Sequence, residues 1–238
     1  FVTCTYDDEN YPEDHQINYL DFQLFIKKLR RKTPEKIRYV CVPEYGEKYG
    51  RPHFHAIVFG LPLDDLKQLF SRKDKKGNEY KTYRSETLNK AWGKGFVNVG
   101  YANLNTYKYV AGYLVKNAKA EKDEFSYVDP DTGEIITRKP PRLRASNRPG
   151  IGANWAEKYA KDFFPTGYIH RQGKTFSIPN YFLIILERTE PAMADVFREL
   201  KQKQLAGKTE LTRDELAQYK ARFLHKSAFF DGPQRKAL

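Results

Sequence analysis

Two histidines separated by one residue are the first candidates for chemistry in this sequence. His53 and His55 lie in the run Pro52-His53-Phe54-His55, whose apolar continuation to Gly60 is typical of a β-strand. Because side chains alternate between the faces of a strand, both imidazoles should project from one face and Phe54 from the other. Two neutral imidazoles on one face form half of a site for a divalent metal ion. A chance spacing or a non-metal role is the alternative for the pair taken alone.

A carboxylate is placed to extend this pair to three ligands. Glu44 ends the preceding strand, expected over residues 37–44, and the glycine-containing link 45–51 predicts a hairpin with the histidine strand. Two imidazoles and one carboxylate would leave open positions on a divalent ion for a substrate oxygen. Glu47 in the turn is the competing third ligand, and the weaker alternatives are Asp7 and Asp8, which follow the first strand.

Two tyrosines lie at helical spacing later in the chain. Tyr109 and Tyr113 are four residues apart in a helix expected over residues 105–117, and Lys116 follows on the same side. A phenolate oxygen can attack a phosphodiester and hold its 5′ end covalently, and two tyrosines allow two successive transfers. Lys116 would lower the pKa of a phenol or hold a phosphate oxygen. The alternative is an aromatic stripe facing the core, against which Gly112 suggests the close approach of another chain, since glycine weakens a helix by about 1 kcal/mol.

The charge of the chain indicates a polyanionic partner. Of 238 residues, 42 are Lys or Arg and 30 are Asp or Glu, which gives a net charge of +12. Basic clusters occur at residues 27–38, 72–84 and 138–148, with aromatic rings near them, a combination suited to single-stranded nucleic acid. A merely soluble basic protein is the alternative. The basic residues predicted to bind DNA are Arg51, Lys108, Arg142, Arg144 and Arg148.

Composition excludes several other classes of protein. Aromatic residues make up 15% of the chain, which is too many for a disordered protein. No apolar run approaches the roughly 20 residues of a membrane span. Two cysteines exclude a disulfide framework and a cysteine-based zinc site. We therefore expect a cytosolic protein that does not bind membranes.

The elements that must position these residues form a mixed pattern. Strands are expected over 1–6, 37–44, 52–60 and 96–101, hairpins over 75–83, 125–138 and 168–177, and helices over 19–32, 62–70, 85–92, 105–117, 154–163, 192–205 and 213–226. Interleaved elements with frequent hairpins favour an α+β fold with a central antiparallel sheet flanked by helices. Residues 1–145 are predicted to form one domain, and residues 146–238 a mostly helical C-terminal extension that packs on it and helps to bind DNA.

Three segments, in this order, resemble the three motifs of the HUH endonucleases, the rolling-circle replication initiators. Phe1-Val2-Thr3-Cys4-Thr5-Tyr6-Asp7-Asp8-Glu9 is similar to the first motif, Arg51-Pro52-His53-Phe54-His55 to the His-hydrophobic-His motif, and Tyr109 to Lys116 to the tyrosine motif. The wording is closest to the initiators of microviruses, small single-stranded DNA phages, of the gokushovirus type. The resemblance extends from Phe1 to about Glu190.

This resemblance implies a fold and a set of site residues. The family fold is a central antiparallel sheet with the histidine pair on a middle strand. Carried over position by position, the family pattern implies that His53, His55 and Glu44 bind Mg²⁺ or Mn²⁺, that Tyr109 and Tyr113 are the nucleophiles, and that Lys116 is the family lysine. Gly112 stands three residues after Tyr109, where some relatives have Lys, so Tyr113 is expected to be the better assisted tyrosine.

The expected function is therefore that of a sequence-specific single-stranded DNA endonuclease and ligase that starts rolling-circle replication. Metal-dependent transesterification would leave a 5′-phosphotyrosine and a free 3′-OH at the origin. Host helicase and polymerase are the implied partners, since the sequence has no helicase motif, and the cytoplasm of an infected bacterium is the implied location. The alternatives are an HUH transposase or relaxase and a noncatalytic protein that binds single-stranded nucleic acid.

Overall fold

The computed structural model describes residues 1–46, 50–73, 77, 79–119, 126–129, 132–171, 173–206 and 212–228. Within its helices, the side chains of residues 113–119, 204–205, 219 and 223–228 lie outside that description. The chain divides into two compact units, one containing Phe1–Ser146 and the other Asn147–Arg222. The predicted boundary between residues 145 and 146 falls next to this division. The packing of the extension on the first domain stays a prediction.

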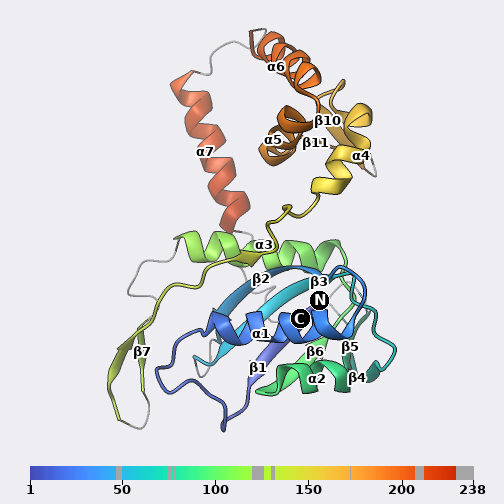
Figure 1. Ribbon diagram of the computed structural model, residues 1–238. Coiled ribbons are helices and arrows are strands. Elements are labelled where there is room, and N and C mark those ends of the chain that lie inside the picture. The colour runs from blue at the N-terminus through green and yellow to red at the C-terminus, as the bar shows by residue number, and fades with distance from the viewer. Residues whose placement is uncertain are drawn as a thin grey trace. The chain divides into compact units, whose positions relative to one another are not determined.

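The first unit contains one large sheet and three helices in its described residues (Figure 1). Its helices are α1 (Tyr19–Lys32), α2 (Glu86–Trp92) and α3 (Leu104–Lys119). Its strands are β1 (Val2–Tyr6), β2 (Arg38–Tyr45), β3 (Pro52–Phe59), β4 (Lys67–Lys73), β5 (Glu79–Arg84), β6 (Gly95–Val99), β7 (Ser126–Val128), β8 (Ile135–Thr137) and β9 (Arg144–Ala145).

The large sheet has seven strands in the order β4-β5-β6-β1-β3-β2-β9, and neighbouring strands run antiparallel. The histidine strand β3 lies between β1 and β2, inside the sheet. The predicted α+β class and the antiparallel sheet are therefore confirmed. Strands β7 and β8 pair with each other as the predicted hairpin over 125–138.

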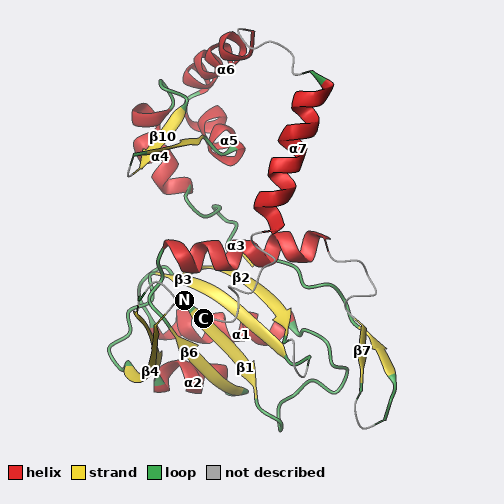
Figure 2. Cartoon of the chain, turned by 180° about the vertical axis from the view of Figure 1, so that it is seen from behind, coloured by secondary structure: helices red, strands yellow, loops and turns green. Residues whose placement is uncertain are grey.

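Helices cover the two faces of this sheet unequally. On one face α1 and α2 enclose the main core, which includes Phe25, Phe54 and Trp92, all almost completely buried. Figure 2 shows these two helices behind the strands. On the opposite face α3 packs on β2 and β3, where Val110 meets Val42 and Ile57. The second face is covered only in part, and the histidines project from it.

One predicted helix is wrong. Residues 62–70 do not form a helix, because the strand β4 begins at Lys67 and pairs with β5. Leu63 and Leu66 pack against the main core from an irregular segment, so their burial needs no helix. The side chains of β4 are exposed throughout, and a helix there would have had no core face to bury.

The second unit is mostly helical, as expected for the C-terminal extension. It contains α4 (Ala153–Phe163), a hairpin of β10 (Tyr168–Arg171) and β11 (Lys174–Ser177), α5 (Asn180–Thr189) and α6 (Pro191–Ala206). The helix α7 (Arg213–Ala228) follows. The sequence did not predict α5, whose Ile185 and Leu186 join a separate core with Phe163, Phe164 and Phe197. No helix in the described part of the chain is long and apolar enough to span a membrane.

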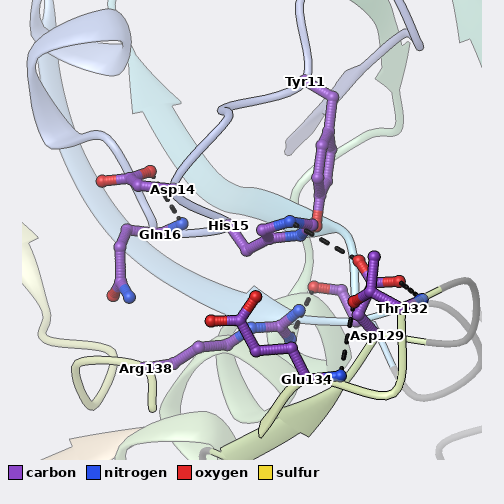
Figure 3. A network of polar contacts seen from close by, with 9 residues as sticks. Tyr11, Asp14, His15, Gln16, Asp129, Thr132, Glu134 and Arg138 are labelled. Atoms are coloured by element: carbon purple, nitrogen blue, oxygen red, sulfur yellow. Dashed lines mark hydrogen bonds and ion pairs between the residues drawn. The ribbon is translucent and has the colours of Figure 1, made fainter. Parts of the chain in front are cut away.

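A buried arginine ties the β7–β8 hairpin to the turn between β2 and β3. The Arg138 side chain is only 5% exposed, and its guanidinium lies over the rings of Tyr127 (4.1 Å) and Tyr45 (4.7 Å). Its Nη1 donates a hydrogen bond to the carbonyl oxygen of Gly50, at 2.9 Å. Among the described residues, its Nε and Nη2 have no hydrogen-bond partner. Figure 3 shows this side chain beside the polar network of Tyr11, His15, Asp129, Thr132 and Glu134.

Candidate active site

The sheet register gathers the predicted metal ligands on one face of the sheet. On β3, His53 lies opposite Glu44 of β2 and opposite Thr5 of β1, while His55 lies opposite Thr3 of β1. Directly opposed residues of antiparallel strands point to the same face, so both histidines and Glu44 share a face with the two threonines. The hairpin predicted from the link 45–51 is thus the element that aligns the carboxylate with the imidazoles.

Threonine hydroxyls fix both imidazole rings from the neighbouring strand. Thr5 Oγ1 is hydrogen-bonded to Nδ1 of His53 at 3.0 Å, and Thr3 Oγ1 to Nδ1 of His55 at 3.2 Å. A partner on Nδ1 orients the ring and directs the remaining nitrogen, Nε2, toward a metal. A hydroxyl can both donate and accept, so it serves either tautomer of the ring.

Glu44 contacts one of these Nε2 atoms directly. Its Oε1 lies 2.7 Å from Nε2 of His55, whose residue is 6% exposed. Two ligands of one divalent ion, each at about 2.1 Å, lie about this far apart or slightly farther. Binding of a metal would therefore replace the proton shared by these atoms with little movement of either side chain.

Burial keeps the other histidine neutral. Desolvation, and next the neighbouring His55, lower the pKa of His53 to about 4. A neutral imidazole is the form that binds metals, so His53 needs no deprotonation near neutral pH. Gly46 leaves room beside it, because a Cβ at that position would lie 2.9 Å from Nε2 of His53.

The donor set fits a divalent metal in its chemistry, but its members do not yet surround one point. Within the described ranges, no three His, Cys, Asp or Glu side chains form a group that could hold an ion as they stand. The rings of His53 and His55 are 6.4 Å apart between centroids and inclined by 45°. The metal set of His53, His55 and Glu44 therefore stays a prediction, with two of its three members in contact.

The competing acidic ligands have other partners or lie outside the described residues. Asp7 accepts hydrogen bonds from the backbone and the side chain of Asn10. Asp8 forms an ion pair with Arg51. Glu47 lies outside the described residues. Of the four candidate carboxylates, Glu44 is the one that the structure brings against a histidine.

The first predicted nucleophile lies against the histidine pair. Tyr109 is on α3, and its ring is edge-on to that of His55, with centroids 5.5 Å apart. Phe1 also contacts both rings, stacked on His55 at 6.0 Å and edge-on to Tyr109 at 6.0 Å. Helix α3 is therefore the element that delivers a phenol to the histidine face. The backbones of Tyr113 and Lys116 belong to α3, but their side chains lie outside the described residues.

The residues predicted to bind DNA are not gathered at this site. The guanidinium of Arg51 is taken up by Asp8 and by the carbonyl oxygen of Tyr6. Arg144 pairs with Cys41, which faces the main core, and its guanidinium lies over Tyr19 of α1. Arg144 is thus on the sheet face opposite the histidines.

The other three predicted DNA-binding residues are exposed. Lys108 precedes Tyr109 on α3, and Arg142 lies before β9. Arg148 belongs to the second unit. Of the predicted set, Lys108 is the residue on the helix that carries the tyrosines.

The site also contains two residues that the sequence did not single out, Thr3 and Thr5. Their alternation in the first strand matches that of His53 and His55, but nothing local in the sequence pairs the two strands. The two hydrogen bonds join residues 52 and 48 positions apart. Only the sheet topology, with β1 beside β3, shows their role.

Comparison with known proteins identifies relatives of this chain. Residues 1–118 match the model of the replication-associated protein ORF2 family. The chain is 31% identical over 218 residues to the replication-associated protein VP4 of Bdellovibrio phage phiMH2K, covering 87% of the chain and 64% of the relative. It is 30% identical over 217 residues to the replication-associated protein ORF2 of Spiroplasma virus 4, covering 85% and 63%.

A third relative is the replication-associated protein ORF4 of Chlamydia phage 1, which is 30% identical over 194 residues, or 79% of this chain and 45% of the relative. The chain thus spans about half to two thirds of the length of these proteins. No solved structure matches it. The three alignments together with the match over residues 1–118 show that the chain belongs to the replication-associated protein ORF2 family, whose members compared above come from phages.

Proposed function

We propose that this chain is an HUH-type endonuclease that nicks and rejoins single-stranded DNA at a phage replication origin. The observation that carries the proposal is the contact between Tyr109 and His55, on the face where Glu44 meets His55. A phenol, two oriented imidazoles and a carboxylate on one face match the needs of phosphodiester transesterification. The membership in a replication-associated family supplies the substrate class.

The proposed metal site consists of His53, His55 and Glu44. A bound Mg²⁺ or Mn²⁺ would polarise the scissile phosphate and offset its negative charge. The chain holds the ligands ready through Thr3 and Thr5, which orient the two rings. On binding, Nε2 of His55 gives up the proton that it shares with Glu44, and Nδ1 then donates to Thr3.

Tyr109 is the proposed nucleophile in the first transfer. Its hydroxyl loses a proton to solvent, the phenolate oxygen forms a bond to phosphorus, and the bond from phosphorus to the 3′ oxygen breaks. The leaving 3′ oxygen takes a proton from water and becomes the free 3′-OH. The phosphodiester bond energy is kept in the tyrosine ester, so the reverse reaction rejoins the strand without another energy source.

Tyr113 and Lys116 complete the proposal on the same helix. A second tyrosine one helical turn later would accept a strand while the first adduct is still in place. Lys116 would neutralise a phosphate oxygen or stabilise a phenolate. Host helicase and polymerase are the proposed partners, because the sequence has no helicase motif, and the cytoplasm of the infected bacterium is the proposed location.

The test is a denaturing gel of the protein with single-stranded oligonucleotides tiled across the genome that encodes it. Each oligonucleotide is labelled at its 5′ or 3′ end and incubated with Mn²⁺ or with EDTA. We expect a detergent-resistant adduct that carries the 3′ label, because the protein joins the new 5′ end, and that forms only with Mn²⁺. His53→Ala should abolish the adduct while leaving DNA binding.

The outcome of this gel also separates the alternative functions. DNA binding without an adduct across the whole tiling set would favour a noncatalytic binder of single-stranded nucleic acid. Transfer of the bound strand to unrelated ends, in place of rejoining, would favour a transposase or relaxase.

A further inference from the structure

A cavity of about 400 Å³ opens beside the candidate site on the same side of the sheet. His55 and Tyr109 line it, and so do residues of β4, β5, β6 and the segment before α3. Its volume is within the range of about 300–1,000 Å³ typical of small-molecule sites. The functions proposed above for His55 and Tyr109 do not use this space.

The sheet register continues the histidine face into this cavity. One row of directly opposed residues crosses four strands, from Arg84 through Asn98 and Thr3 to His55. Tyr80 is four residues before Arg84 on β5, so it projects from the same face. This part of the sheet, away from α3, is uncovered in Figure 2.

Aromatic rings dominate the outer part of the cavity. Tyr101 is 70% exposed, with its ring edge-on to that of Tyr83 at 5.4 Å. The Tyr80 hydroxyl accepts a hydrogen bond from Nδ2 of Asn105 at 3.2 Å, which restrains its ring. Phe70 is 41% exposed. Exposed rings around a polar cavity bury little in this fold, whereas they are the platforms on which unpaired bases stack.

Polar and charged groups complete the lining. The exposed carboxamide of Asn98 offers one acceptor and two donors, the set that reads the edge of a nucleobase. Arg72 and Lys81 add positive charge, and Glu79 adds one negative charge. Mixed charges and aromatic walls suit an uncharged ring in the cavity, with phosphates outside it near the basic groups.

We propose that this cavity binds one unstacked nucleobase of the DNA strand whose phosphodiester is cut at Tyr109. Tyr80 and Tyr101 stack on the base, and Asn98 determines which base is preferred. The inference rests on the proposed function for the identity of the strand, and it makes the cavity a specificity-determining part of the nicking site.

The test compares two single strands of about 15 nucleotides, the length that one such protein surface covers. One carries thymine at every position, and the other has the same phosphates but no bases. Fluorescence anisotropy in EDTA measures both affinities without any cleavage. The wild type should prefer the strand with bases by about tenfold, because stacking on an aromatic ring contributes substantially for each base.

Variants assign that preference to the cavity. Tyr101→Ala and Tyr80→Ala should each reduce the preference several-fold with unchanged affinity for the abasic strand, and Tyr80→Phe should keep it. Tyr107→Ala is the matched control, because Tyr107 is 41% exposed on α3, stacks on Phe59 and does not line the cavity. Asn98→Ala should change the ratio of affinities between oligo(dA) and oligo(dT).

Two results would overturn the inference. One is equal binding of the two strands by the wild type, including no binding of either, and the other is an equal loss of preference in Tyr107→Ala and Tyr101→Ala. A base preference that follows the variants without any covalent adduct in Mn²⁺ would support the cavity and contradict the nicking proposal. An adduct without base preference would do the reverse.

Discussion

At the scale of the residue, the site depends on which atoms of the two imidazoles are occupied. The period of two in a strand predicted that His53 and His55 share a face, and the short hairpin predicted that Glu44 lies beside them. Both predictions needed only local geometry. Thr3 and Thr5 could not be predicted, because their strand pairs with residues about 50 positions later, and such pairing follows from the whole sheet.

We predict that Thr5→Val weakens the binding of Mn²⁺ by about tenfold or more, because a ligand histidine that loses the partner of its other nitrogen loses its orientation. Isothermal titration of the purified protein with Mn²⁺ measures the effect. Thr5→Ser keeps the hydroxyl and serves as the control, with an affinity near that of the wild type. Equal affinities for Val and Ser at this position would contradict the role given to the hydroxyl.

A second prediction at this scale concerns pH. The pKa of His53 is about 4 in the folded chain and 6.5 in the reference state, so between these values the unfolded chain binds a proton that the folded chain does not. The free energy of unfolding should therefore decrease as pH falls from 6.5 to 4, by at most about 1.4 kcal/mol per pH unit from this group. Above pH 6.5 the group should contribute no pH dependence.

Urea unfolding in EDTA at several pH values measures this slope, and EDTA keeps metals from binding the folded state. His53→Gln should show a shallower slope over the same interval, since it removes one titrating group. Identical slopes for the two proteins would show that His53 is not held neutral by the fold.

At the scale of the element, most strands and helices could be predicted from pattern and turn residues. The helix at Tyr19–Lys32 and the strand at Val2–Tyr6 were predicted nearly to the residue, since each has one clearly apolar face. The segment around Lys67–Lys73 was mistaken for a helix, because its state is decided by pairing with Glu79–Arg84 and not by a buried face of its own. An edge hairpin of this kind depends on a tertiary partner that local spacing does not show.

The contact of Arg138 with the β2–β3 turn gives a prediction about elements. We expect Arg138→Ala to lower the free energy of unfolding by about 2–4 kcal/mol, since it removes a charged donor from the Gly50 carbonyl and a cation from two aromatic rings. Chemical denaturation measures the change. Arg142→Ala is the control, because that side chain is exposed, and its effect should stay within about 0.5 kcal/mol. Similar losses in both variants would contradict the tie between hairpin and turn.

At the scale of the whole molecule, charge and family membership point to the same class of partner. The net charge of +12 favours a polyanion, and the relatives are replication-associated proteins of phages. The chain spans 45–64% of the length of those relatives, so their further residues are not represented here. The two compact units have separate cores, which the sequence indicated only through a boundary without a clear linker.

We predict that the affinity of the full chain for single-stranded DNA falls steeply with salt, with a slope of about −0.7 in log K against log salt for each phosphate that is neutralised. Lys108→Gln should reduce the magnitude of this slope by about that amount, because Lys108 is exposed beside Tyr109. Anisotropy titrations across a salt series measure it. Lys90→Gln is the control, since Lys90 lies on α2 at the opposite sheet face and pairs with Glu86. Equal slopes for the wild type and Lys108→Gln would place the DNA elsewhere.

The central claim is that tyrosines of α3 form the covalent bond to DNA. The most direct measurement is the Mn²⁺-dependent adduct of the wild type, Tyr109→Phe, Tyr113→Phe and the double variant, on one gel with one oligonucleotide that the wild type cuts. Nuclease digestion and mass spectrometry of the adduct then locate the modified peptide. We predict an adduct on the peptide that contains Tyr109 or Tyr113, and none in the double variant. An adduct that persists in the double variant, or that maps to another residue, would contradict the claim.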